Sequence, residues 1–124
     1  MLPQQFKLQS SADFSFVVRK GRRVGRRTVV LHILDRSAYQ GAKADVPFVR
    51  QGGPHVGLIV SKAVGNSVVR HAIARKLRHI AAAVAPEISA DLDIVIRALP
   101  RSADATSEEL EKDVRSALKI APRR

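Results

Sequence analysis

The residues best suited to chemistry lie between Ser61 and His79, in the segment SKAVGNSVVRHAIARKLRH. Ten of its positions carry a cationic or hydrogen-bonding side chain, and none carries an acid. As a helix with about 100° of rotation per residue, the segment separates an apolar arc from a polar remainder. That polar remainder holds Arg70, His71, Arg75 and Arg78. We therefore expect one face of this helix to pack on a core while the other face meets phosphates.

The positive charge is concentrated in the first part of the chain. The 124 residues include 22 Lys plus Arg and 11 Asp plus Glu, a formal net charge of +11. Residues 1–86 hold 15 basic and 3 acidic side chains, which gives +12, whereas residues 87–124 hold 7 and 8, which gives −1. A local excess of this kind attracts polyanions, so the composition favours a nucleic-acid partner.

Independent catalysis has little support in the sequence. The chain has no Cys, which excludes a disulfide framework, a thiolate metal site and a thiol nucleophile. A nuclease would need clustered carboxylates for metal ions, or two histidines acting as acid and base. No acid falls in the basic segment, and His71 and His79 would be about 12 Å apart along a helix. We therefore assign no catalytic residue, and the positions of metal ions stay open at this point.

Periodicity and capping residues predict the elements that position these side chains. Helices are expected from Ser10 or Ser11 to about Lys20, from an Asn66 cap to just before Pro86, and after a Thr106–Glu109 capping box. Strands are expected at 28–34, 56–60 and 93–98, with a possible short edge strand at 46–49. This order predicts one domain over 1–124, an α/β (α+β) two-layer sandwich. A mobile loop at 36–54 and a short tail at 121–124 complete it.

Three blocks of the sequence resemble the bacterial ribonuclease P protein subunit. SKAVGNSVVRHAIARKLRHI is similar to the family's signature, LPQQFKLQSSADFSFVVRKGRR to its N-terminal segment, and DIVIRALP to its fourth strand. The blocks occur in the family's order and spacing, and the resemblance covers most of the chain except the loop at 36–54. His71, Ala72 and Ala74 depart from the signature, which has cations at two of these positions. Having Ala72 in place of a cation is expected to weaken RNA docking without changing the fold.

The resemblance implies a fold and a role. The fold would be the family's αβββαβα arrangement, related to a ribosomal-protein domain, with a left-handed βαβ crossover. Family members help a catalytic RNA remove the 5′ leader of precursor tRNA. Mg²⁺ would be held mainly by that RNA and the substrate, with no cofactor tightly bound to protein. The residues implicated in binding the catalytic RNA are Lys62, Asn66, Arg70, His71, Arg75, Lys76 and Arg78.

The resemblance also implies a cleft for the single-stranded leader, between the first helix and the sheet. Its lining would be Phe14, Val18 and His32, with Phe16 and Lys62 as possible neighbours. Without the family, Phe14 and Val18 would be assigned to the core, because residues four apart share a helix face. The basic turn GRRVGRR adds Arg22, Arg23, Arg26 and Arg27, which either contact RNA or serve solubility.

Two other classes of nucleic-acid-binding protein are alternatives to a ribonuclease P subunit. A ribosomal or ribosome-assembly RNA-binding protein would also have a basic patch and this order of elements. A double-stranded DNA reader fits less well, because the sequence has no dimerisation heptad, zinc site or helix-turn-helix pattern. The longest apolar stretches are too short to span a bilayer. We therefore expect a cytoplasmic protein that binds ribonuclease P RNA and precursor tRNA, with neither a membrane nor DNA as partner.

Overall fold

The computed structural model describes residues 11–36 and 54–122, which form a mixed α+β fold. The main elements are α1 (Ser11–Lys20), β1 (Arg22–Gly25), β2 (Val29–Asp35), β3 (His55–Ile59), α2 (Ser67–Val84), β4 (Leu92–Ala98) and α3 (Ser107–Ala117). Short 3-10 segments are η4 (Ala85–Glu87), η5 (Pro100–Asp104) and η6 (Leu118–Ile120). The expected α+β class and the αβββαβα order are confirmed.

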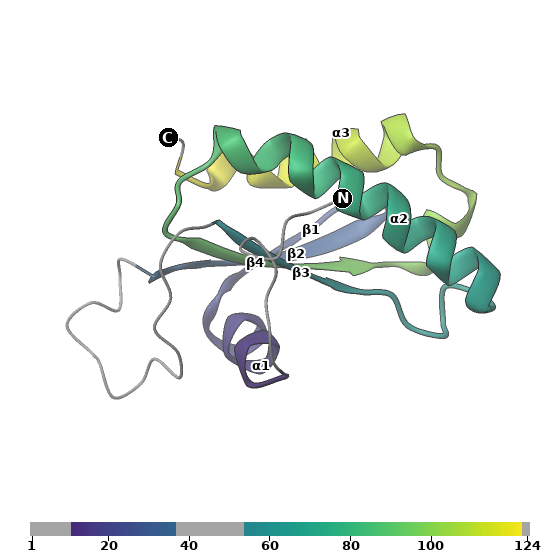
Figure 1. Ribbon diagram of the computed structural model, residues 1–124, viewed down its shortest axis with the longest axis horizontal. Helices are drawn as coiled ribbons and strands as arrows, with labels where there is room; N and C mark the ends of the chain where they lie inside the picture. Colours follow the sequence, from purple (N-terminus) through teal and green to yellow (C-terminus); the bar gives the residue numbers. More distant parts are fainter. Residues whose placement is uncertain (1–10, 37–53, 123–124) are drawn as a thin grey trace.

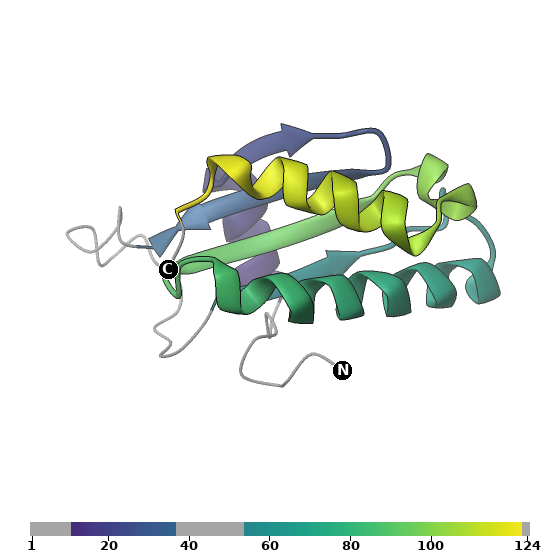
Figure 2. The same ribbon diagram turned by 90° about the horizontal axis from the view of Figure 1, so that it is seen from above.

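The four strands form one sheet in the order β1-β2-β4-β3. β2 pairs antiparallel with β1 and β4, whereas β3 and β4 are parallel. α2 connects β3 to β4 over one face of the sheet (Figure 2). When the sheet is viewed from the side of α2 with β3 and β4 pointing upward, β4 lies to the left of β3. The chain therefore moves to the left as it passes from β3 through α2 to β4. This crossover is left-handed, against the strong preference of βαβ units.

Helices cover both faces of the sheet. α2 and α3 lie side by side over one face, and α1 crosses the other (Figure 1). Side chains alternate between the faces along a strand. Val29, Leu31 and Ile33 therefore join the large core under α2 and α3, while Leu34 joins the smaller core under α1. Both cores are built of apolar side chains, and they hold α1 and α2 on opposite sides of the strands.

Local capping fixes where the helices begin. Asn66 accepts a hydrogen bond from the backbone N–H of Val69 at 3.0 Å, as predicted for the N-cap of α2. At α3, Thr106 Oγ1 accepts from Glu109 N at 3.1 Å, and Glu109 Oε1 accepts from Thr106 N at 2.8 Å. Each bond satisfies a helix N–H that has no partner within the helix. Hydrogen bonds that the Glu109 carboxylate receives from the backbone and the side chain of Thr106 lower the pKa of Glu109.

Gly21 sits where α1 turns into β1. Its N–H donates to the carbonyl of Val17 at 2.8 Å. A Cβ at this position would lie 2.5 Å from that carbonyl oxygen and 3.0 Å from the carbonyl oxygen of Ile33. Only glycine allows the backbone to approach so closely, which confirms the expected end of the first helix at Lys20.

Two expectations need correction. Arg22–Gly25 is not a turn but the edge strand β1, whose mainly exposed, charged residues hide the alternation by which a strand is recognised. Residues 121 and 122 are not a free tail, because Ala121 is buried and the Pro122 carbonyl accepts from Ser89 N at 2.9 Å. Ser10, the possible strand at 46–49 and most of the loop at 36–54 lie outside the described residues.

Candidate nucleic-acid interface

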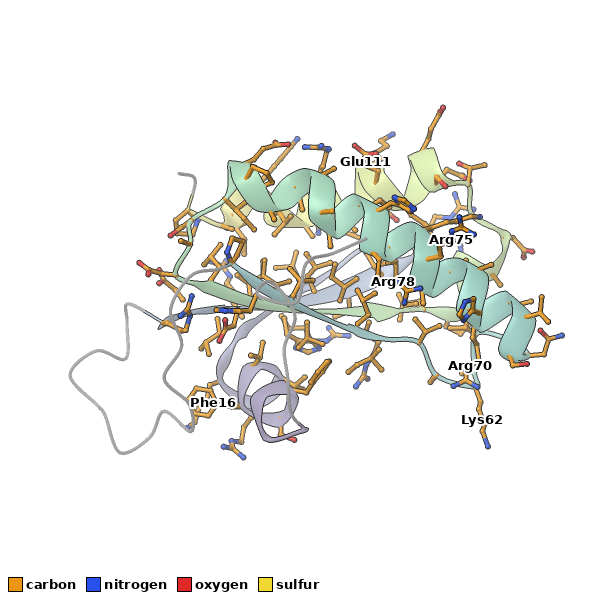
Figure 3. The ribbon with its side chains drawn as sticks, viewed as in Figure 1. Phe16, Lys62, Arg70, Arg75, Arg78 and Glu111 are labelled. Atoms are coloured by element: carbon orange, nitrogen blue, oxygen red, sulfur yellow. The ribbon has the colours of Figure 1, made fainter. Side chains whose placement is uncertain are left out.

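α2 presents a cationic face away from the core. Its buried residues are Ile73, Leu77, Ile80, Ala81 and Val84, which follow the predicted apolar arc. His71, Arg75 and His79 are exposed, and Arg70, Lys76 and Arg78 are half-buried. Figure 3 shows Arg70, Arg75 and Arg78 spread along α2. The helix contains no acid, so a polyanion approaching it meets no opposing charge.

Three of the residues predicted to bind RNA also hold the protein together. Arg70 Nε donates to the Val60 carbonyl at 3.2 Å, which ties α2 to the end of β3. Lys76 Nζ donates to the Ala105 carbonyl at 3.4 Å, beside the start of α3. Asn66 is occupied as the N-cap. Arg75, Arg78 and His71 are therefore the better candidates for direct contact with phosphates.

Two hollows adjoin this face. The larger one, here the α2–α3 groove, has a volume of about 630 Å³ and runs between the two helices. It is lined by Val68, His71, Ala72, Arg75, Lys76, His79, Ile80, Ser107 and Glu111. The smaller one, here the basic hollow, has a volume of about 380 Å³ and is lined by His71, Arg75, Arg78 and His79. The two hollows share His71, Arg75 and His79, so they lie next to each other along α2.

A second cationic surface lies on the opposite face of the sheet. Arg23 on β1 pairs with His32 on β2, which pairs with Val95 on β4. Arg97 lies two residues beyond Val95 and so on the same face, and it is exposed in a strand that is otherwise buried. Burial, then the charges of Arg97 and Arg23, lower the pKa of His32. Two guanidinium groups thus flank a histidine that favours its neutral form.

His32 itself is largely enclosed. Its side chain is buried, and its Nδ1 has no hydrogen-bond partner among the described residues. Buried polar atoms without a partner are rare in folded proteins, and each calls for an explanation. Because this nitrogen is enclosed, His32 contributes to the packed surface of the sheet and is not an exposed binding group.

The aromatic residues of α1 divide into core and edge. Phe16 is 3% exposed and packs with Val17, Leu34 and Val95 in the smaller core, while Phe14 and Val18 are partly buried at its margin. The Arg19 guanidinium lies 5.9 Å from the centre of the Phe16 ring. Of the two aromatic rings, Phe14 is therefore the one that can present a face to a base. Lys62 is exposed in the loop after β3, and Figure 3 shows it well separated from Phe16.

The four arginines of the GRRVGRR stretch also differ. Arg22 and Arg23 are exposed on β1, and Arg27 is exposed beyond it. Arg26 is structural, because its Nε donates to Ser116 Oγ at 2.9 Å and its Nη2 donates to the Ser116 carbonyl at 3.3 Å. Neighbouring Thr28 donates through its hydroxyl to Asp113 Oδ2 at 2.6 Å. Arg22, Arg23 and Arg27 remain candidates for RNA contact.

A buried His–Asp pair forms a structural network. His55 Nδ1 lies 3.0 Å from Asp93 Oδ1, and Arg36 Nε lies 3.3 Å from the same oxygen. Arg36 also donates to the carbonyls of Asp91 and Ala90. His55 is 2% exposed and Asp93 0%, so no substrate reaches the pair. The network joins the end of β2 to β3 and β4.

Neither a metal cluster nor a membrane span is found in the described part of the chain. Residues 11–36 and 54–122 contain no group of three or more His, Cys, Asp or Glu that could hold a metal ion. The helices within these ranges also lack the length and apolar character needed to cross a bilayer.

Sequence reasoning missed Arg97. It is the one basic residue of the LDIVIRA strand, and its exposure shows that this face of β4 is open at that point. A lone cation in a mainly apolar strand is the signal that could have identified it. Its neighbours Arg23 and His32 come from other strands, so their association with Arg97 required the sheet order.

Comparison with known proteins gives one consistent result. The Ribonuclease P family model matches residues 2–122. The chain is 50% identical over 128 residues to the ribonuclease P protein component of Nocardia farcinica, covering 96% of this chain and 82% of that protein. It is 49% identical over 118 residues to the component of Rhodococcus opacus, covering 95% and 90%.

Solved structures with a similar fold are also RNase P proteins. The RNase P protein of Staphylococcus aureus, at 25% identity, superposes with a TM-score of 0.74 over 93% of this chain and 94% of that one. The Thermotoga maritima RNase P protein, at 15% identity, shares the fold with a TM-score of 0.73 over 91% and 97%. The chain therefore belongs to the ribonuclease P protein family, the protein components of an endoribonuclease made of RNA and protein.

Proposed function

We propose that this protein uses α2 to bind the ribonuclease P RNA and uses the opposite face of the sheet to bind the 5′ leader of precursor tRNA. By holding both, it assists magnesium-dependent removal of the leader, with the RNA as the catalyst. The observation that carries this proposal is the presence of cationic surfaces on opposite sides of one sheet. A protein with two such surfaces can contact two RNA segments at once.

The α2 surface suits a large folded RNA. Its cations extend along an 18-residue helix, and its apolar side is fixed on the core. A helix of that length spans about 27 Å, enough to contact several phosphates. Phosphate contacts position an RNA without reading its sequence, so affinity should depend strongly on salt.

The surface around His32 suits a single strand. Arg23 and Arg97 supply charges for a backbone, and the half-buried Phe14 supplies a ring at the margin of the α1 core. Stacking a base on an aromatic ring contributes about 1–3 kcal/mol and tolerates any sequence, as leaders of different tRNAs require. His32 lies buried at the floor of this surface, between the strands that carry the two arginines.

Mg²⁺ prefers carboxylate and phosphate oxygens in octahedral geometry, and residues 11–36 and 54–122 contain no group of three or more His, Cys, Asp or Glu that could hold a metal ion. We assign the metal to the RNA and the substrate. The chain's own contribution is to bring cations close to both backbones, which lowers the repulsion between them.

Site-specific photocrosslinking tests the assignment of the two surfaces. A benzophenone amino acid at position 75 should crosslink to the ribonuclease P RNA, and the same group at position 97 should crosslink to the leader. Crosslinks from both positions to the same RNA would contradict the proposal. Recovery of ribosomal RNA in place of ribonuclease P RNA, when the protein is captured from cells, would favour a ribosomal role.

A further inference from the structure

We propose that the α2–α3 groove holds one unpaired nucleobase of the partner RNA, and that the basic hollow beside it holds a phosphate of the same strand. This inference rests on the proposed function, because it specifies how α2 meets its RNA. It follows from the different linings of the two hollows and from the row of side chains between them.

Two rows of side chains run along α2. Val68, Ala72, Lys76 and Ile80 are spaced by four, as are His71, Arg75 and His79 in the adjacent row. Residues four apart on a helix lie above one another, so each row forms a continuous stripe. The first row, which is mostly apolar, lines only the groove, whereas the second row lines both the groove and the basic hollow.

The first row leaves apolar surface exposed in a cationic region. Val68 is 76% exposed, and Ala72 is also exposed. Because Ala72 ends at a methyl group, the groove stays open at its middle. Its volume of about 630 Å³ falls within the roughly 300–1,000 Å³ usual for pockets that enclose small ligands. A flat base could lie against this row with its π-face on Val68 and Ala72.

The side chains that α3 contributes to the groove favour a base over a phosphate as its occupant. Glu111 lines this wall, and its carboxylate accepts a hydrogen bond from Arg115 Nε at 2.8 Å. A carboxylate repels a phosphate but accepts N–H groups from the edge of a base. In the basic hollow the lining is Arg75, Arg78 and two histidines, which attract a phosphate. The base therefore belongs in the groove and the phosphate in the hollow.

The test fills the groove without changing any charge. Ala72→Leu places a larger side chain in the groove, and Ala83→Leu, at an exposed α2 position that lines neither hollow, is the matched control. Ribonuclease P RNA is probed with dimethyl sulfate, which modifies unpaired adenine and cytosine, with and without each protein. The wild type should protect at least one unpaired base. Ala72→Leu should lose that protection and bind several-fold more weakly, because the base loses its apolar contact with the groove.

The salt dependence separates base from backbone contacts. Ala72→Leu should keep the wild-type slope of log affinity against log salt, because it removes no phosphate contact. Val68→Ser, which makes an exposed apolar side chain of the groove smaller and polar, should lose the same protection. This second variant guards against misfolding of the first. Wild-type protection and affinity in both variants would overturn the inference while leaving the proposed function intact. Failure of the wild type to bind the RNA would refute the proposed function itself.

Discussion

Arg23 on β1 lies directly opposite His32 on β2, on the face of the sheet that α1 crosses. Paired residues of antiparallel strands point to the same side, so the guanidinium and the imidazole are neighbours. Arg97 acts on the same histidine from β4. The cations of α2 lie on the other side of the sheet. The two basic surfaces can therefore be altered independently.

Reversing charge at Arg97 is expected to weaken binding of the leader alone. The complex with Arg97→Glu should lose part of its preference for precursor over mature tRNA, because mature tRNA has no leader. Losing one contact to a single strand should also reduce the salt slope for precursor by about 0.7. Affinities for both tRNAs, measured at several salt concentrations, check this.

Arg101→Glu is the control for this change, since Arg101 is exposed on η5. It makes the same change in net charge and should preserve the preference for precursor. Equal affinity losses for precursor and mature tRNA in Arg97→Glu would argue against a leader surface around His32.

Reversing charge on α2 should have the complementary effect. Arg75→Glu and Arg78→Glu are each expected to weaken binding of ribonuclease P RNA and to reduce the salt slope by about one per lost contact. Lys112→Glu, at an exposed position on α3, should change both much less. Filter binding across a salt series provides the measurement. A slope unchanged by both α2 variants would exclude this face as the docking surface.

The two phenylalanines of α1 should behave differently. Phe16→Ala removes a buried ring and is expected to lower the free energy of unfolding by about 3–5 kcal/mol. Phe14→Ala removes a half-buried ring and should cost much less stability, yet reduce the preference for precursor tRNA. Urea denaturation and tRNA binding on the same preparations distinguish these effects. A similar loss of stability in both variants would place Phe14 in the core.

His32 should make stability depend on pH. Its pKa is lowered from the ordinary 6.5 in the folded protein, so below pH 6.5 the unfolded chain binds more protons than the folded one. Stability should therefore fall as the pH drops through this range. Arg97→Gln removes one of the two positive charges that lower the pKa of His32, so this pKa should rise. An NMR titration of the His32 ring in both proteins measures the shift, and an unchanged titration would show that Arg97 does not act on it.

The helices were predictable because their signals are local. Asn66 bonds three residues ahead, and the Thr106–Glu109 box closes over three residues, so both can be recognised in a short window. β1 could not be recognised in this way. Its charged residues form a strand only because β2 lies alongside, and nothing within Arg22–Gly25 shows that partner.

The roles of individual cations depended even more on distant contacts. Arg26 bonds to Ser116, 90 positions away, and Arg70 bonds to Val60 across the loop before α2. In the sequence these residues look the same as Arg23 and Arg75, which remain exposed. Residue type and spacing thus located the basic helix correctly, but only the packing separated structural arginines from available ones.

We propose that this protein assists ribonuclease P RNA in removing the leader. The most direct measurement is 5′ processing of a precursor tRNA by a bacterial ribonuclease P RNA, at low magnesium and near-physiological salt, with and without the protein. We expect the protein to stimulate cleavage at the mature 5′ end well above RNA alone, and the protein alone to be inactive. Tight binding to the RNA without any stimulation, or cleavage by the protein free of RNA, would contradict the account.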